Sequence, residues 1–176
     1  MELKKLITPI GLIALIVATR LLPHPANVAS VAAVALTSGL YLNGRRRWLI
    51  PLAGLFISDL FLGFYRWEIM LTVYLSHLAV FFIGTKLRQQ RALPNIIIAS
   101  LAGSLIFFIT TNLAVWFFGS WYTKDLAGLS LAYWLALPFF RNSLLGDLVY
   151  CLSLTGVAEA ALYIKLAAKQ KSWRLG

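Results

Sequence analysis

The stretch PNIIIASLAGSLIFFITTNLAVWFF, residues 94–118, decides the fold, because its 25 residues include no charged side chain. As a helix it would cover about 38 Å, more than the roughly 30 Å of a bilayer's hydrocarbon core. Similar apolar runs fill the chain, which is 60% hydrophobic and 12% charged, with a mean hydropathy of +0.80. A soluble domain needs a polar surface that this composition cannot supply. The sequence therefore predicts an all-α membrane protein with a single integral membrane domain, residues 1–176.

Charged residues and prolines divide the chain into six predicted transmembrane helices in one bundle. We place these helices at residues 6–22, 27–44, 48–65, 69–85, 94–118 and 142–166. Pro9, Pro51 and Pro94 fall in or near first turns, where a missing N–H costs nothing. Residues 126–140 would cover only about 22 Å as a helix, which is too short for a span. We therefore expect them to form a short outer-face interfacial or re-entrant helix, closed by Pro138.

Lysine and arginine predict the orientation, because cytoplasmic loops collect these residues. With the N-terminus inside, the outer side holds four cations: Arg20, Arg66, Lys124 and Arg141. The inner side holds twelve: Lys4, Lys5, Arg45, Arg46, Arg47, Lys86, Arg88, Arg91, Lys165, Lys169, Lys171 and Arg174. If residues 126–140 crossed as a seventh helix, this bias would vanish. We therefore expect both termini in the cytoplasm and attribute the net charge of +10 to orientation, not to nucleic-acid binding.

Strongly polar side chains gather toward the predicted outer half of the bundle. A charge within the hydrocarbon costs at least about 2.5–3.5 kcal/mol, so carboxylates there need partners. By depth, the expected ion pairs are Arg20 with Asp59 and Arg141 with Asp147. Such pairs either lock the helices together or line an outward-facing ligand pocket, and we favour the pocket.

The predicted pocket combines polar contacts with aromatic walls, as small-molecule sites require. Its polar contacts would be Arg20, His24, Asn27, Asp59, Asn112, Arg141, Asn142 and Asp147. Its stacking walls would be Trp116, Trp121, Tyr122 and Tyr133. His77 stands in the middle of the fourth predicted span. There it either bonds to a neighbouring helix or serves as a metal ligand or part of a proton path.

Signals of catalysis are absent from the sequence. It contains no H-E-x-x-H, G-x-S-x-G or G-x-x-x-x-G-K-[ST] motif, and no two histidines at metal-ligand spacing. We therefore expect no enzyme, no cofactor and no resident metal. An intramembrane enzyme, the least favoured alternative, would need water access to Asp59 or His77.

Small residues recur four apart on the predicted helices. The pairs are Ala14 and Ala18, Ala29 and Ala33, Ala35 and Gly39, and Ala99 and Gly103. Such pairs let helix backbones approach closely in lipid. Packing within the bundle is the simpler interpretation, and docking against a partner membrane protein is the alternative.

Four segments resemble a bacterial family of small, functionally uncharacterised integral membrane proteins. They are RLLPHPANVASVAAVALTSGLY (20–41), PLAGLFISDLFLGFY (51–65), TNLAVWFFGSWY (111–122) and LAYWLALPFFRNSLLGDLVY (131–150). The size, six-helix plan and inside termini are also similar to the substrate-binding S components of energy-coupling-factor (ECF) vitamin transporters. S components capture a vitamin or similar micronutrient at their outer half, and they topple in the membrane when paired with a T component and two ATPases.

The second resemblance implies roles for particular residues. Ala14 and Ala18 would dock the partner, and His77 would ligate a metal-centred substrate. We therefore predict a substrate-binding subunit in the bacterial inner membrane that captures a micronutrient or vitamin-like molecule for uptake. The alternative is a structural or assembly subunit of a larger membrane complex, whose outer half would be filled, with no cavity of about 300 Å³ or larger.

Overall fold

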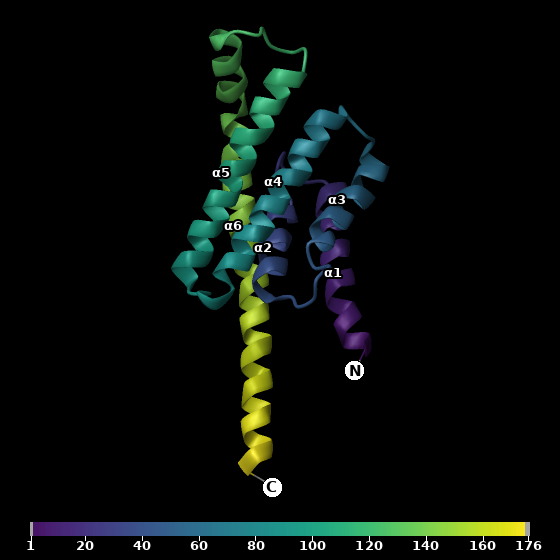
Figure 1. Ribbon diagram of the computed structural model, residues 1–176, viewed down its shortest axis with the longest axis vertical. Coiled ribbons are helices and arrows are strands. Elements are labelled where there is room, and N and C mark those ends of the chain that lie inside the picture. The colour runs from purple at the N-terminus through teal and green to yellow at the C-terminus, as the bar shows by residue number, and fades with distance from the viewer. Residues whose placement is uncertain (1, 175–176) are drawn as a thin grey trace.

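The protein is all-helical throughout the part of the chain that the computed structural model describes, residues 2–174, with side chains described for 8–167 and Gln170. Within these residues there are six α-helices, one short 3-10 helix and no β-strand (Figure 1). The elements are α1 (Glu2–Leu21), α2 (Val31–Tyr41), α3 (Leu49–Leu62), α4 (Trp67–Lys86), η1 (Leu87–Gln89), α5 (Leu93–Phe118) and α6 (Leu126–Arg174). The predicted all-helical bundle is therefore confirmed.

Three helices are long and apolar enough to cross a membrane. They correspond to residues 67–89, 93–118 and 126–167. The prediction of six such helices is wrong for α2 and α3, which have 11 and 14 residues, and the described apolar part of α1, Thr8–Leu21, is also short. The loops take residues that we had placed in helices: Asn27 adopts a left-handed φ of 63°, and Gly63 ends α3 with a φ of 92°.

α2 lies inside the bundle, where it packs against α3, α4, α5 and α6. Ten of its eleven residues are buried. It crosses α4 at very short range: a Cβ added to Gly39 would lie 2.3 Å from the Phe81 carbonyl oxygen, and one added to Gly84 would lie 2.3 Å from that of Leu36. Only glycine allows the two backbones to come this close. The packing role predicted for Gly39 is therefore confirmed.

α6 is a single helix of 49 residues that includes residues 126–140, so the predicted separate interfacial helix is wrong. Pro138 lies in its interior, where we had placed a helix end, and Pro9 likewise lies inside α1. α5 runs alongside the first part of α6 and packs against it (Figure 1). The length of residues 126–140 alone could not predict this packing. The Tyr133 hydroxyl donates to the Ile109 carbonyl at 2.7 Å.

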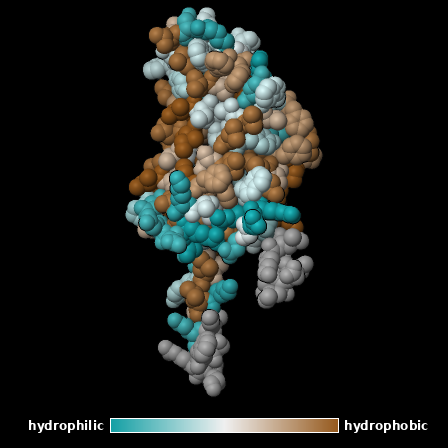
Figure 2. Space-filling model, in the orientation of Figure 1, coloured by the Kyte–Doolittle hydropathy of each residue, from teal (hydrophilic) through white to brown (hydrophobic). Residues whose placement is uncertain are grey.

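The two ends of the bundle differ in charge. We call the end with loops 42–48 and 87–92 the basic end, because it carries Arg45, Arg46, Arg47, Arg88 and Arg91. The chain termini are drawn on the same side of the bundle as these loops (Figure 1). Figure 2 shows a hydrophilic band at this level and a largely hydrophobic surface above it. The opposite end has loops 22–30, 63–66 and 119–125. We call it the cavity end, because a cavity described in the next section lies near it.

Not all of the predicted cytoplasmic cations can be located in the same detail. The side chains of five of them lie outside the described part of the chain: Lys4, Lys5, Lys169, Lys171 and Arg174. Between the two ends, large apolar side chains such as Leu75, Phe82 and Ile98 are exposed on the bundle surface. A surface of this kind suits contact with lipid tails.

Candidate functional site

A cavity of about 320 Å³ lies toward the cavity end, and all six helices or the loops beside them contribute to its walls. Four of the predicted polar contacts line it: Arg20, His24, Asn27 and Asp147. Arg20 stands in the last turn of α1, and His24 and Asn27 follow it in the loop before α2. Sequence positions up to 127 residues apart thus meet around one hollow.

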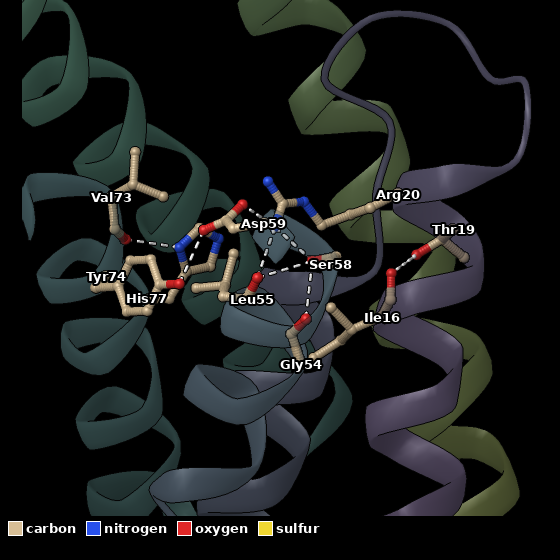
Figure 3. A network of polar contacts seen from close by, with 10 residues as sticks. All are labelled: Ile16, Thr19, Arg20, Gly54, Leu55, Ser58, Asp59, Val73, Tyr74 and His77. Carbon is tan, nitrogen blue, oxygen red and sulfur yellow. Dashed lines mark hydrogen bonds and ion pairs between the residues drawn. The ribbon is translucent and has the colours of Figure 1, made fainter. Parts of the chain in front are cut away.

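Arg20 is anchored on α3 by an ion pair and two hydrogen bonds (Figure 3). Its Nη1 lies 2.7 Å from Asp59 Oδ1, with Arg20 17% exposed and Asp59 1% exposed. The same nitrogen donates to the Leu55 carbonyl at 3.1 Å and to Ser58 Oγ at 2.5 Å. Both of its hydrogens are therefore used, and its contact with Asp59 Oδ1 is an electrostatic attraction without a hydrogen bond. Tyr74 donates to Asp59 Oδ2 at 2.8 Å. The predicted Arg20–Asp59 pair is confirmed, and Asp59 lies behind the cavity wall.

His77 of α4 also faces this cavity. Its Nδ1 lies 2.8 Å from the Val73 carbonyl oxygen, which can only accept, so Nδ1 carries the proton. The neutral ring then leaves Nε2 as an acceptor. The ring packs edge-on against Phe107, with centroids 5.1 Å apart. The predicted bond from His77 to a neighbouring helix is wrong for this contact, because the acceptor, Val73, lies one turn earlier on α4 itself.

Asp147 of α6 is buried at 8% exposure and lines the cavity. Ser104 of α5 donates to its Oδ2 at 2.6 Å. The predicted pair with Arg141 does not form, because six residues along a continuous helix place the two side chains about a third of a turn apart and about 9 Å along the axis. Among the described residues no cation lies within ion-pair distance of Asp147.

The remaining predicted polar contacts lie beside the cavity. Asn112 borders a second cavity of about 250 Å³, which shares Asn27, Tyr65 and Phe107 with the first. The Asn142 side chain donates to the carbonyl of Ala26 at 3.0 Å and so ties α6 to the loop that carries His24 and Asn27. Arg141 is exposed on α6 and lines neither cavity.

The predicted aromatic walls lie elsewhere. Trp116, Trp121, Tyr122 and Tyr133 line neither cavity. The indole N–H of Trp116 donates to the Thr123 carbonyl at 2.8 Å in the loop between α5 and α6, and Trp121 is 73% exposed. The α5–α6 pair carries these side chains beyond the cavity, because α6 begins at Leu126 and not near residue 142 as we had predicted.

Sequence reasoning missed the side chains that complete the site. Tyr65 and Phe107 provide the aromatic walls, and the Ser58 and Ser104 hydroxyls hold Arg20 and Asp147. In a helix sequence, a serine that bonds to another helix looks the same as one that bonds back to its own backbone. Tyr65 could have been considered from the sequence, because it ends the segment 51–65 that carries the family resemblance and follows Gly63 by two residues.

The two small-residue positions predicted to dock a partner are accessible. Ala14 and Ala18 are both exposed on α1. The four-residue spacing places them on the same face of the helix. The described structure contains a single chain, so docking stays a prediction.

The fold and the cavity define an all-helical membrane protein with a polar, aromatic-walled hollow near one end of its bundle. The chain belongs to a family of unknown function (DUF6580), whose model matches residues 2–170. No curated protein and no solved structure matches the chain. The predicted membership of an uncharacterised family is therefore confirmed, whereas the likeness to ECF S components stays a prediction.

Proposed function

We propose that this protein is a substrate-binding membrane subunit that captures a small micronutrient or vitamin-like molecule for uptake, in the manner of ECF S components. The observation that carries the proposal is the cavity of about 320 Å³. Small-molecule sites are concave and mostly apolar, with a few placed polar groups, and typically start at about 300 Å³. Arg20 and Asp147 supply such groups here, and Tyr65 and Phe107 supply flat apolar walls.

The proposal includes an orientation in the bacterial inner membrane. Cytoplasmic loops collect Lys and Arg, so we assign the basic end and both termini to the cytoplasm. The cavity end then faces outward, where a nutrient arrives. In this view α2 and α3 complete the six-helix bundle without spanning the full bilayer, because other helices enclose α2 and shield its backbone from lipid.

Uptake against a gradient would require an energy source, and the sequence has no nucleotide-binding motif. We propose that a T component with ATPase subunits supplies it. The exposed Ala14 and Ala18 support a docking face on α1. Glu159 of α6 still contacts the bundle, because it accepts a hydrogen bond from Tyr41 at 2.7 Å. The last part of α6 extends away from the bundle at the basic end (Figure 1), and Val157, Ile164 and Leu166 are exposed.

The same protruding helix favours the second candidate function, a structural or assembly subunit of a larger membrane complex. That function predicts co-purification with other membrane proteins and no bound small molecule. Replacing both Val157 and Ile164 with Glu would then abolish co-purification. Under the capture proposal, the same replacement leaves ligand binding intact, because both residues lie outside the cavity lining.

The direct test is mass spectrometry of small molecules that remain bound through purification of the full chain in mild detergent. Ala29→Phe would fill the cavity, because Ala29 is part of its wall. Ala14→Phe is the matched control, since Ala14 is exposed on α1 and lies outside the lining. We expect a bound compound in the unaltered protein and in Ala14→Phe, and its loss in Ala29→Phe. Absence of any bound compound from the unaltered protein would favour the structural subunit.

A further inference from the structure

The charges around the cavity do not balance. Apart from the two histidines, Arg20 and Asp147 are the lining residues whose side chains can carry a full charge at neutral pH. The charge of Arg20 is matched by Asp59 at 2.7 Å, and its Nη1 hydrogens are directed to Leu55 and Ser58. Asp147 has no such match: its one described partner is the neutral hydroxyl of Ser104. The cavity therefore has one carboxyl group without a counter-charge among the described residues.

A buried charge without a counter-charge is costly, and folds normally provide the partner. Here the partner is missing from the described residues, and the carboxylate is open to the cavity instead. The N-terminus of α2 also reaches the cavity through Val31 and Ala32. A helix N-terminus provides only about half a positive charge, spread over its free N–H groups. When Asp147 is ionised, the site is therefore net negative.

The free lone pairs point to the same ligand chemistry. Ser104 occupies Oδ2 of Asp147, and Oδ1 has no hydrogen bond from any described residue. The ring of His77, a lining residue, donates through Nδ1 to Val73, which leaves Nε2 of the neutral ring as a second acceptor. A ligand that brings donors would satisfy both acceptors. The rings of Tyr65 and Phe107 add faces that attract a cation.

We infer that the ligand carries a protonated amine, or a comparable cationic hydrogen-bond donor, and that Asp147 receives it. This inference rests on the proposed capture function and specifies its substrate class. A ligand cation supplies the counter-charge that the fold leaves out. The apolar remainder of the ligand lies against Tyr65 and Phe107. Asp147 thus acts as the residue that selects the charge of the ligand.

The test compares three probes of similar size and shape: 2-phenylethylammonium, the neutral 2-phenylethanol and the anionic 3-phenylpropionate. Binding to the purified full chain in mild detergent is measured by thermal shift and by titration at pH 7. We expect the cation to bind best. A charge-assisted contact with the buried Asp147 favours it over the neutral probe by about tenfold or more. Equal binding of the neutral probe, stronger binding of the anion, or no binding of the cation would overturn the inference.

Asp147→Asn removes the charge and keeps the size of the side chain. Asp125→Asn is the matched control, because Asp125 lies just before α6 in an exposed loop, far along the helix from the cavity lining. We expect Asp147→Asn to weaken binding of the cation about tenfold or more and Asp125→Asn to leave it unchanged. Unchanged binding in a folded Asp147→Asn variant would overturn the inference. The comparison of probes on the unaltered protein decides the question even if that variant fails to fold.

The inference and the proposed function fail in different ways. If an anionic compound is found bound to the purified protein, the capture function stands and the inference about charge is wrong. If the purified protein holds no compound and none of the three probes binds, both are wrong.

Discussion

Replacing Asp59 with Ala should destabilise the protein severely, because it leaves Arg20 charged and nearly buried. The two charges lie 2.7 Å apart, which corresponds to about 6 kcal/mol of attraction at an effective dielectric constant of about 20. Desolvation offsets part of this gain, and removing one member of a buried pair typically costs about 3–5 kcal/mol. The Tyr74 hydroxyl also loses its acceptor at 2.8 Å. We therefore expect Asp59→Ala to lower the free energy of unfolding by about 3–5 kcal/mol.

Equilibrium unfolding with SDS in mixed micelles measures this free energy. Arg20→Leu combined with Asp59→Leu should be much less harmful than Asp59→Ala, because it removes both charges together. The exposed pair of Arg66 and Glu68, whose Nε and Oε2 lie 3.1 Å apart, is the control, and its removal should change stability little. A loss below about 1 kcal/mol for Asp59→Ala would refute the view that this pair locks α1 to α3.

Three further outcomes can be checked. Gly84→Ala should cost about 1–3 kcal/mol or more in the same unfolding assay, because its Cβ would meet a backbone oxygen at 2.3 Å, whereas Gly11→Ala, with no atom within 4 Å, should be tolerated. Asn142→Ala should weaken capture of the bound compound, since it frees the loop before α2, and equal retention in mass spectrometry would contradict this. The backbone N–H of Gly128 and the Thr123 hydroxyl hold the pKa of Asp125 below its usual range; its stabilisation is therefore full above the ordinary pKa and is lost as the pH falls through the lowered one. The protection of amides at the start of α6 against hydrogen exchange, corrected for the intrinsic exchange rate, should fall in that acidic window, and Asp125→Asn should remove the dependence.

The sequence predicts the fold class and one ion pair of the site correctly, because both depend on broad patterns. Apolar run length identifies helices regardless of their neighbours, and comparison of depth was enough to pair Arg20 with Asp59. Helix ends were harder to predict: α2 begins at Val31, and Asn27, predicted as the first residue of that helix, lies in the preceding loop with a left-handed φ. Such a conformation leaves no trace in hydropathy.

The rest of the site depends on which helices touch, and hydropathy does not contain that information. Pro138 suggested a helix end, whereas contacts with α5 keep α6 continuous through it. Because α6 is continuous from Leu126, Trp116 and Trp121 lie beyond the cavity and not in its wall as predicted. The continuous helix also places Asp147 against Ser104, not against a cation.

The burial of α2 has a consequence for the order in which the chain assembles. The surfaces that enclose this helix belong largely to α4, α5 and α6, all of which the ribosome makes later. Its eleven residues are too few to settle across a bilayer alone. α2 can therefore reach its buried position only after the C-terminal half of the chain has been synthesised. A truncated chain that ends before α6 should remain sensitive to proteolysis around residue 31.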